Sequence, residues 1–195
     1  MIPSARSQVW TRKHAERLPI AKDGYLPISA LIAHKNLRRL AASKADVLQI
    51  VADDRKARFH VRDDCIRANQ GHSMQNVLVN MEEIKDASEV PVAVHGTIWT
   101  AWDHIKHQGL SVMGRQHIHL ATNVGTEGVI SGMRTTSQVW IYVDIPKMLE
   151  DGIRIFRSRN GVILTRGIDG VLPTKYFKSV VNARKRTVIF PPPTE

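Results

Sequence analysis

The sequence predicts an α+β protein with two lobes, a small helical lobe followed by a larger lobe built around a β-sheet. Apolar residues recur at helical spacing within residues 27–54, whereas short strand-like runs dominate after residue 92. Between them, the locally acidic stretch 79–92 contains a proline and is the expected connection. A chain of 195 residues can bury a hydrophobic core in each lobe. We therefore expect a first lobe over residues 1–88 and a second over residues 89–195.

The first lobe has the pattern of two helices followed by a β-hairpin. Ser43 is placed to cap the second helix, because its hydroxyl can accept a hydrogen bond from a backbone N–H of the first turn. The expected elements are helices over residues 27–37 and 43–54, then strands over residues 57–61 and 65–69 joined by a turn. Two helices and a two-stranded wing describe a winged-helix arrangement, a frequent shape among nucleic-acid-binding proteins.

The second lobe is expected to be a sheet with at least one helix. Residues 139–145 are almost continuously apolar, which is typical of a buried central strand. Gly109 is placed to end the predicted helix at its C-terminus. The expected elements are strands over residues 92–97, 117–121, 139–145 and 161–165, and a helix over residues 100–110.

The charge of the chain favours a polyanionic partner such as RNA. Lys and Arg number 28 against 18 acidic residues, which gives a net charge of +10. The excess is uneven, because residues 1–50 hold nine bases and three acids, and residues 153–167 hold four arginines and no acid. Neutralisation of phosphates by such residues supplies affinity for nucleic acid that does not depend on base sequence.

Other features of the sequence exclude several classes of protein. No apolar run approaches the length of a membrane-spanning helix, and the N-terminus lacks the apolar core of a signal peptide. Cys65 is the only cysteine, so neither an intrachain disulfide nor a cysteine-based zinc site can form. We therefore expect a protein of the cytoplasm, the nucleus or both, with no membrane contact.

The stretch GRQHIHLAT, residues 114–122, is a candidate binding segment. If it is one strand, Arg115, His117 and His119 share one face. A zinc site would need further ligands, and a neighbouring arginine would repel the cation. An anion site uses the same arginine, because a guanidinium can donate two parallel hydrogen bonds to a phosphate. The pattern therefore predicts an anion site and no metal.

Several other short strings combine Arg or His with small polar residues. They contain Arg58; Arg67, Gln70, His72 and Ser73; His95 and Thr97; Ser131 and Arg134; and Arg157, Ser158 and Asn160. Each alone is typical of a turn or a surface group, but together they favour a phosphate-rich ligand. A serine nucleophile at Ser73 is disfavoured because no G-x-S-x-G motif is present. No Walker loop or G-x-G-x-x-G motif is present either, so a bound dinucleotide would not use a Rossmann crevice.

Taken in order, these strings resemble the RNA 2′-phosphotransferase family (KptA-type). The similar strings are DGYLPISALI, KARFHV, IRANQGHSM, VHGT, GRQHIHLA, GVISGMR, FRSRNGVILT and LPTKYF, which together extend over most of the chain. The resemblance implies an N-terminal winged-helix RNA-binding lobe over residues 1–88. It also implies a C-terminal lobe of the ADP-ribosyltransferase fold over residues 89–195 that binds NAD⁺ as a co-substrate.

The resemblance also implies an activity and a partner. The enzyme would remove the internal splice-junction 2′-phosphate from tRNA by transfer to NAD⁺, releasing nicotinamide and ADP-ribose 1″,2″-cyclic phosphate. No metal is implied, and we expect a monomer. Two alternatives remain open from the sequence. The first is an NAD-dependent ADP-ribosyltransferase that modifies nucleic-acid phosphate ends, and the second is a catalytically impaired RNA-binding remnant.

The residues that match the family's motifs receive roles by this resemblance. Arg58 and Arg115 would be catalytic, and Arg12 and His14 stand where the family has an Arg-His pair. Here that pair is interrupted as Arg12-Lys13-His14, so either its geometry is shifted or the start of the chain is altered. The expected NAD⁺-binding residues are His95, Gly96, Thr97, His119, Ser131, Arg134, Arg157 and Ser158. The expected RNA-phosphate-binding residues are Arg67, Gln70 and His72.

Overall fold

The structure, a computed structural model, describes residues 18–72, 81–124, 133–134 and 136–191. These residues form two compact units. The N-terminal unit comprises the described part of residues 1–80 together with residues 114–116, and the C-terminal unit comprises the remainder from Met81 onward. Helices and antiparallel sheets are both present, so the chain is a mixed α/β protein. Among the described helices, none is both long and apolar enough to cross a lipid bilayer.

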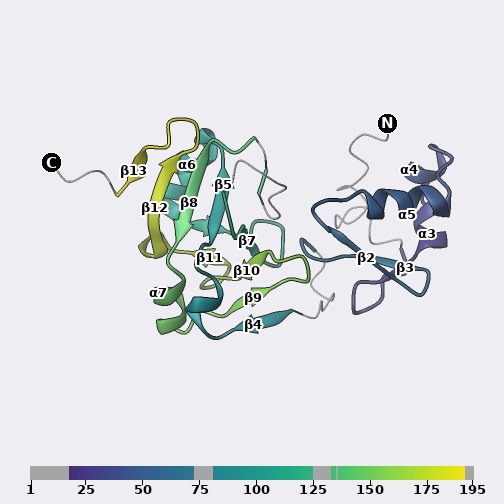
Figure 1. Ribbon diagram of the computed structural model, residues 1–195, viewed down its shortest axis with the longest axis horizontal. Helices are drawn as coiled ribbons and strands as arrows, with labels where there is room; N and C mark the ends of the chain where they lie inside the picture. Colours follow the sequence, from purple (N-terminus) through teal and green to yellow (C-terminus); the bar gives the residue numbers. More distant parts are fainter. Residues whose placement is uncertain (1–17, 73–80, 125–132, 135, 192–195) are drawn as a thin grey trace. The chain divides into compact units, whose positions relative to one another are not determined.

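The N-terminal unit packs short helices on one face of a three-stranded antiparallel sheet (Figure 1). Its elements are β1 (Leu26–Pro27), α3 (Ile28–Ala33), α4 (Lys35–Arg38), α5 (Lys44–Ala52), β2 (Phe59–Arg62) and β3 (Cys65–Ala68), and the strand order is β1-β3-β2. Asp63 and Asp64 form the β2–β3 turn with φ angles of 48° and 60°. The predicted hairpin is therefore confirmed.

The two faces of this small sheet differ in chemistry. Phe59, Val61 and Ile66 lie on the face that packs against the helices. His60 in β2 lies opposite Arg67 in β3, on the other face of the sheet. Because side chains alternate along a strand, the same sequence supplies both the core and a polar face.

The helices of this unit are partly as predicted. Ser43 caps α5: its hydroxyl accepts a hydrogen bond from the Asp46 N–H at 3.2 Å, and the Asp46 carboxylate accepts one from the Ser43 N–H at 2.8 Å. The single helix expected over residues 27–37 is instead two, broken at His34, which has an extended backbone. In one straight helix Leu37 would lie about 180° around the axis from Ile28. The break lets both residues reach the core.

The C-terminal unit contains two four-stranded sheets and a two-stranded ribbon. Its elements are β4 (Glu82–Ile84), η1 (Ala87–Glu89), β5 (Val94–Thr97), α6 (Trp99–Gln108), β6 (Leu110–Ser111), β7 (Ile118–Leu120), β8 (Val139–Val143), α7 (Ile145–Glu150), β9 (Ile155–Arg157), β10 (Ile163–Thr165), β11 (Val171–Leu172), η2 (Thr174–Tyr176), β12 (Phe177–Asn182) and β13 (Val188–Phe190). The strand orders are β4-β9-β10-β7, β13-β12-β8-β5 and β11-β6. Val94 and Ala121 exchange backbone hydrogen bonds of 2.9 and 2.8 Å, which joins the two larger sheets.

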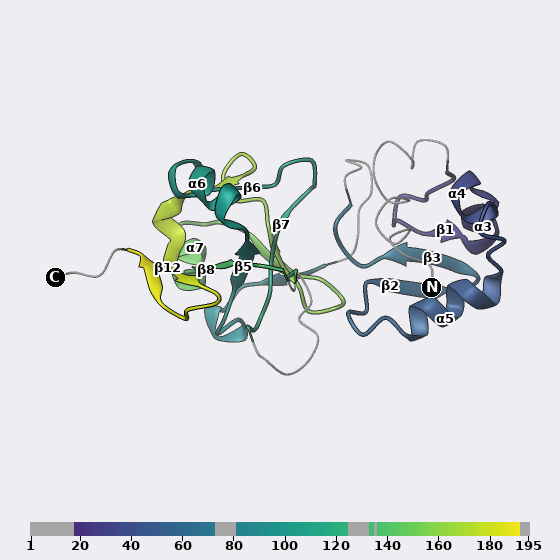
Figure 2. The same cartoon turned by 90° about the horizontal axis from the view of Figure 1, so that it is seen from above.

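Helix α6 lies on one side of the sheet that contains β5, β8 and β12 (Figure 2). The Trp102 ring of α6 lies 6.4 Å from the Phe177 ring and 6.0 Å from the Phe190 ring. Gly109 ends the helix with a φ of 84°, and a Cβ there would overlap the Leu172 carbonyl. The predicted helix and its terminus at Gly109 are confirmed.

Strand β8 lies between β5 and β12, as predicted for a central strand. Val139, Ile141 and Val143 are buried, whereas the intervening Trp140 and Tyr142 are half-buried on the opposite face. The strand is two residues shorter than expected because Asp144 caps α7.

Residues 81–88, which the boundary drawn from the sequence assigned to the first lobe, belong to the C-terminal unit. Strand β4 pairs with β9, with Glu83 opposite Phe156. The structural division therefore falls before Met81, earlier than the boundary drawn from the sequence. The acidic character of this segment suggested a linker, but its carboxylates serve as partners for arginines of β9 and of the segment before it.

Candidate functional site

Arg58 is held in place by a buried carboxylate. Its Nη2 and Nε lie 2.6 and 3.0 Å from Asp54 Oδ1, and its backbone N–H donates to Asp54 Oδ2 at 2.8 Å. The Asp54 side chain is 2% exposed, whereas that of Arg58 is 37% exposed. Burial acts to raise the pKa of Asp54, but the hydrogen bonds and charge of Arg58, together with a hydrogen bond from the Lys56 backbone, outweigh it and leave that pKa below its ordinary value. Asp54 therefore stays ionised and fixes the direction of the guanidinium.

Asn69 connects Arg58 to the end of strand β3. Its backbone N–H donates to the Arg58 carbonyl at 2.8 Å, and its side-chain amide donates to the Ala57 carbonyl at 2.6 Å. Asn69 is buried. The chain that leads from β3 toward His72 is thus tied directly to the backbone of Arg58.

Arg67 lies against an aromatic ring on the polar face of the sheet. Its guanidinium is 4.8 Å from the centre of the Tyr25 ring, and its Nη1 donates to the Asp23 carbonyl at 3.2 Å. The guanidinium of Arg62 lies 4.3 Å from the centre of the same ring. The Tyr25 hydroxyl lies 2.6 Å from His60 Nδ1. Arg67 is only 8% exposed, and within the described part of the chain its buried Nε has no hydrogen-bond partner.

Arg115 belongs to the N-terminal unit, although it lies far along the sequence. The backbone N–H of the next residue, Gln116, donates to the His72 carbonyl at 3.1 Å, and residues 114–116 form part of that unit. Arg115 itself is exposed, and His72 is buried. Because His72 follows Gly71, whose φ of 87° suits glycine, the turn after Gln70 brings the two segments together.

The strand expected over residues 117–121 is present as β7, which begins only at Ile118. The condition that one strand passes through Arg115, His117 and His119 is not met, so the shared face that depended on it does not form. The centre of the His117 ring lies 6.3 Å from the centre of the Phe156 ring. Burial lowers the pKa of His117, and the charge of Arg166 lowers it further.

His95 and His119 lie together in the C-terminal unit. His95 Nδ1 is 3.0 Å from the His119 carbonyl, and a carbonyl can only accept, so Nδ1 carries the proton. A Cβ at Gly96, the next residue of β5, would overlap the side chains of Met133 and Ser137. Glycine therefore leaves room for Met133 and Ser137 beside this strand, and a larger residue would force their side chains to move. Thr97 ends β5, and its carbonyl accepts a hydrogen bond from the Gln138 N–H at 2.7 Å.

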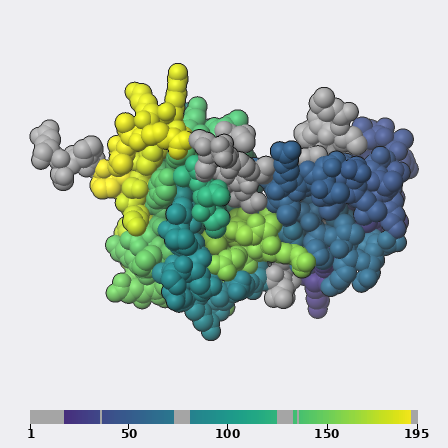
Figure 3. All heavy atoms as spheres, viewed as in Figure 1, coloured from purple at the N-terminus to yellow at the C-terminus, as the bar shows by residue number. Residues whose placement is uncertain are grey.

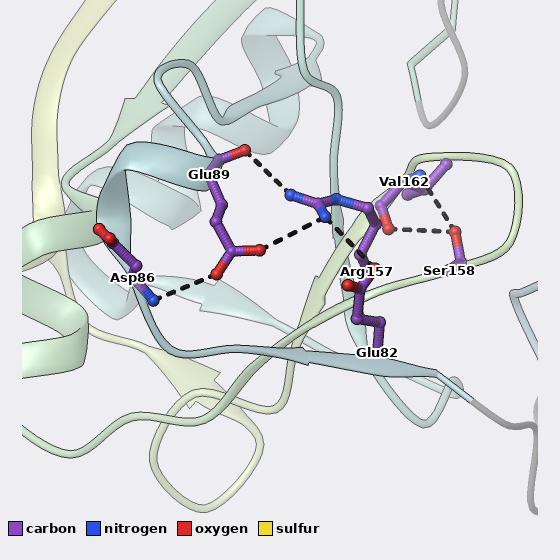
Figure 4. A network of polar contacts seen from close by, with 6 residues as sticks. All are labelled: Glu82, Asp86, Glu89, Arg157, Ser158 and Val162. Carbon is purple, nitrogen blue, oxygen red and sulfur yellow. Dashed lines mark hydrogen bonds and ion pairs between the residues drawn. The ribbon is translucent and has the colours of Figure 1, made fainter.

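Arg157 and Ser158 are engaged in internal contacts (Figure 4). The Arg157 guanidinium lies 3.3 Å from the Glu82 carboxylate and 3.6 Å from the Glu89 carboxylate, and it donates to the Glu89 carbonyl at 2.9 Å. Ser158 is buried, and its hydroxyl lies 3.0 Å from both the N–H and the carbonyl of Val162. These contacts join β4 and η1 to β9 and close the turn between β9 and β10.

The remaining predicted residues are Gln70, which is half-buried, Arg134, and three residues outside the described ranges. Arg134 is exposed, and its carbonyl accepts hydrogen bonds from Ser137. Arg12, His14 and Ser131 lie outside the described residues. Within those residues, no three His, Cys, Asp or Glu side chains gather in a way that could hold a metal ion.

The structure thus distributes the predicted site residues over both units. The N-terminal unit contains Arg58, Arg67, Gln70, His72 and Arg115, and the C-terminal unit contains His95, Gly96, Thr97, His119, Arg134, Arg157 and Ser158. Sequence reasoning missed Asp54 and Asn69. The spacing of Asp54, four residues before Arg58, is the one signal that could have indicated the pair.

Comparison with known proteins gives one consistent family. A sequence model described as RNA 2′-phosphotransferase, Tpt1 / KptA family, matches residues 9–167. The chain is 43% identical over 171 residues to a putative tRNA 2′-phosphotransferase of Schizosaccharomyces pombe, covering 85% of this chain and 46% of that protein. It is 42% identical over 176 residues to tRNA 2′-phosphotransferase 1 of Homo sapiens, covering 86% of this chain and 69% of that protein.

A more distant relative agrees with these. The chain is 33% identical over 178 residues to the tRNA 2′-phosphotransferase of Saccharomyces cerevisiae, covering 85% of this chain and 76% of that protein. The chain spans about half the length of the Schizosaccharomyces pombe relative and about two thirds of the human one. The family match includes the segments that carry Arg58, His72, His95 and Arg115. The chain belongs to the RNA 2′-phosphotransferase, Tpt1 / KptA family.

Proposed function

We propose that the chain is a tRNA 2′-phosphotransferase, which removes the internal splice-junction 2′-phosphate from RNA by transferring it to NAD⁺. Beyond the family membership, one structural observation supports this activity. The hydrogen bond from the Gln116 N–H to the His72 carbonyl joins the segment of Arg115 to the segment that follows Arg67. Asn69 in turn ties that segment to Arg58. Arginines distant in sequence are thereby gathered in one unit.

The reaction has two steps that balance without a further reactant. A 2′-phosphate oxygen of the RNA attacks the ribose carbon of NAD⁺ that bears nicotinamide, and nicotinamide leaves with the electron pair of the broken bond. The neighbouring ribose hydroxyl then attacks the phosphorus atom. The bond to the RNA 2′-oxygen breaks, that oxygen takes up a proton, and ADP-ribose 1″,2″-cyclic phosphate is released.

This chemistry needs positive charge more than it needs a base. The attacking phosphate is already an anion, and negative charge shifts onto the leaving oxygen in the second step. We assign the stabilisation of this charge to Arg58 and Arg115. The rigid pairing of Arg58 with ionised Asp54 supports this role, because a guanidinium fixed before the reaction needs no reorganisation during it. Arg67, Gln70 and His72 are assigned to the RNA phosphate.

The two units are assigned different ligands. The N-terminal unit acts as the winged-helix-like RNA-binding lobe, and the C-terminal unit acts as the ADP-ribosyltransferase-like lobe that binds NAD⁺. In the C-terminal unit, His95 and His119 face the nucleotide, and Gly96 and Thr97 shape the end of the strand beside them. The contact between His95 Nδ1 and the His119 carbonyl supports the joint assignment of the two histidines. Arg157 and Ser158 support that site through their contacts within the unit. Sequence motifs alone support the assignments of Arg12, His14, Ser131 and Arg134.

One incubation tests this function. The chain is mixed with NAD⁺ and an RNA that carries one internal 2′-phosphate, and both the RNA and the nucleotide products are followed over time. We expect an RNA with a 2′-hydroxyl together with ADP-ribose 1″,2″-cyclic phosphate. A stable ADP-ribosylated RNA would instead indicate an enzyme that stops after the first step. RNA binding without nicotinamide release would indicate a protein that no longer catalyses the reaction.

A further inference from the structure

A second cluster of positive charge lies at the turn between β12 and β13, outside the candidate site. The basic turn, defined here as Arg184, Lys185 and Arg186, is exposed along its whole length. It lies beyond residue 167, where the match to the family ends. Figure 3 shows the segment that contains this turn, in yellow, projecting from the C-terminal unit.

The backbone of the basic turn is held by several hydrogen bonds. The Asn182 side-chain oxygen accepts from the backbone N–H groups of Arg184 and Lys185, both at 3.0 Å. The Arg186 N–H donates to the Asn182 carbonyl at 2.8 Å, and the Ala183 N–H donates to the Gln138 carbonyl at 2.9 Å. The three cations are therefore presented on a defined turn, so little backbone entropy is lost when they meet a ligand.

The charges of the basic turn are not neutralised within the described residues. Other cations of the C-terminal unit form ion pairs, including Lys106, Arg154, Arg157 and Lys175. In the described part of the chain, no ion pair involves Arg184, Lys185 or Arg186. The sequence contains no acidic residue between positions 170 and 194, although this stretch holds five bases. We therefore expect the ligand of the basic turn to be an anion.

Two tryptophans are connected to the basic turn, Trp140 through its ring and Trp99 through its backbone. The Arg186 guanidinium lies 4.2 Å from the centre of the half-buried Trp140 ring. Gln138, whose carbonyl accepts a hydrogen bond from the Ala183 N–H, also accepts one from the backbone N–H of Trp99 through its side-chain oxygen, at 3.2 Å. The Trp99 residue is 39% exposed. Cations together with an exposed tryptophan suit a nucleic-acid strand, since the cations contact phosphates and an exposed indole can stack on a base.

We infer that the basic turn and Trp99 form a second RNA-binding surface, which contacts phosphates of the substrate RNA away from the 2′-phosphate that reacts. The inference rests on the proposed function only in that this function supplies an RNA ligand. It assigns to the β12–β13 turn a contribution to RNA affinity and none to the chemical step. Its effect should grow with RNA length, because a longer RNA offers more phosphates to the surface.

The test compares two substrates and two charge-matched variants. The variant Arg184→Ala/Lys185→Ala removes two charges from the turn and leaves Arg186 on Trp140. The control Lys106→Ala/Lys147→Ala removes two charges from helices of the same unit. Both are assayed with a full-length tRNA and with a three-nucleotide RNA, each bearing one internal 2′-phosphate. We expect the turn variant to raise KM for the tRNA by about 10-fold with kcat unchanged, and to leave both constants unchanged for the short RNA. The control should resemble wild type.

Binding measurements separate this inference from the proposed function. Without NAD⁺, the dissociation constant for tRNA lacking the 2′-phosphate should rise in the turn variant, and the dependence of its logarithm on log salt should flatten by about 1 to 2. Trp99→Ala should weaken binding of the same RNA. If the wild-type protein binds tRNA with the expected salt dependence but releases no nicotinamide, the proposed function is refuted and the inference is left intact.

Three outcomes would overturn the inference. The first is an unchanged tRNA KM and dissociation constant in the turn variant. The second is a lower kcat on the short RNA, which would place the turn at the reaction centre. The third is loss of binding to vesicles of anionic phospholipid with tRNA binding intact, which would assign the charge to a membrane surface.

Discussion

Arg58 and Asp54 form an ion pair just after helix α5, with Arg58 Nη2 2.6 Å from Asp54 Oδ1 and the carboxylate almost fully buried. The carboxylate accepts both side-chain and backbone hydrogen bonds from the same arginine. A group held this firmly is suited to meet a transferring phosphate in one orientation. In this account the role of Asp54 is to position Arg58.

The orientation of Arg58 is predicted to depend on the charge of Asp54. Asp54→Asn keeps the size of the side chain but removes the charge that orients the guanidinium. We expect turnover of 2′-phosphorylated RNA to fall by about 10- to 100-fold, with a smaller change in KM for the RNA. Steady-state kinetics at a temperature where both proteins are folded provide the measurement. Wild-type kcat in this variant would show that Arg58 needs no fixed orientation.

Arg115 is predicted to act in the reaction and not in folding. It is exposed, so Arg115→Ala should lower turnover by about 100-fold or more while the unfolding midpoint stays near that of wild type. Arg38→Ala is the matched control, because it removes the same charge from an exposed position of helix α4 in the same unit. Equal activity of the two variants would remove Arg115 from the site.

For Arg157, we predict an effect on stability instead of on NAD⁺ binding. Its guanidinium lies among two carboxylates and a carbonyl, and its side chain is 28% exposed (Figure 4). Arg157→Ala should lower the free energy of unfolding by about 1 to 3 kcal/mol and change KM for NAD⁺ by no more than about 3-fold. The control Arg154→Ala breaks an exposed pair with Glu83 and should leave stability close to wild type. A large rise in KM for NAD⁺ with normal stability would instead make Arg157 a nucleotide ligand.

His117 gives the stability a defined pH dependence. Burial, with the charge of Arg166, lowers the pKa of His117 below the ordinary value of about 6.5. As pH falls through that value the unfolded chain takes up a proton at His117 and the folded chain does not, so stability declines. Between about pH 7.5 and about pH 5.5, wild type should therefore lose more free energy of unfolding than His117→Gln. Denaturant titrations at the two pH values provide the measurement, and equal losses in both proteins would contradict the assignment.

Local signals in the sequence identify individual elements well. The Ser43 cap and the Gly109 terminus mark the ends of α5 and α6, because each depends on one residue and its immediate backbone. The apolar run that became β8 likewise reveals a central strand. In these places the local preference of the chain and its tertiary environment agree.

Properties that depend on pairing between distant segments were not visible in the sequence. The segment around Arg157 carries several arginines, which favoured an anion site, but strand pairing with β4 supplies carboxylates to two of them. The alternation around Arg115 suggested one strand, yet the chain joins the N-terminal unit there through Gln116 and enters β7 only afterwards. Periodicity reports which residues could share a face, and the tertiary partners decide where a strand begins.

The central claim is that Arg58 and Arg115 act on the same phosphate. The most direct measurement is a double-mutant cycle on the rate of 2′-phosphate removal under single-turnover conditions, with Arg58→Ala, Arg115→Ala and the double variant. Groups that stabilise one transition state together are not independent, so the double variant should be slower than either single variant but far less impaired than the product of the two losses. A wild-type rate in either single variant, or losses that multiply fully, would contradict the claim.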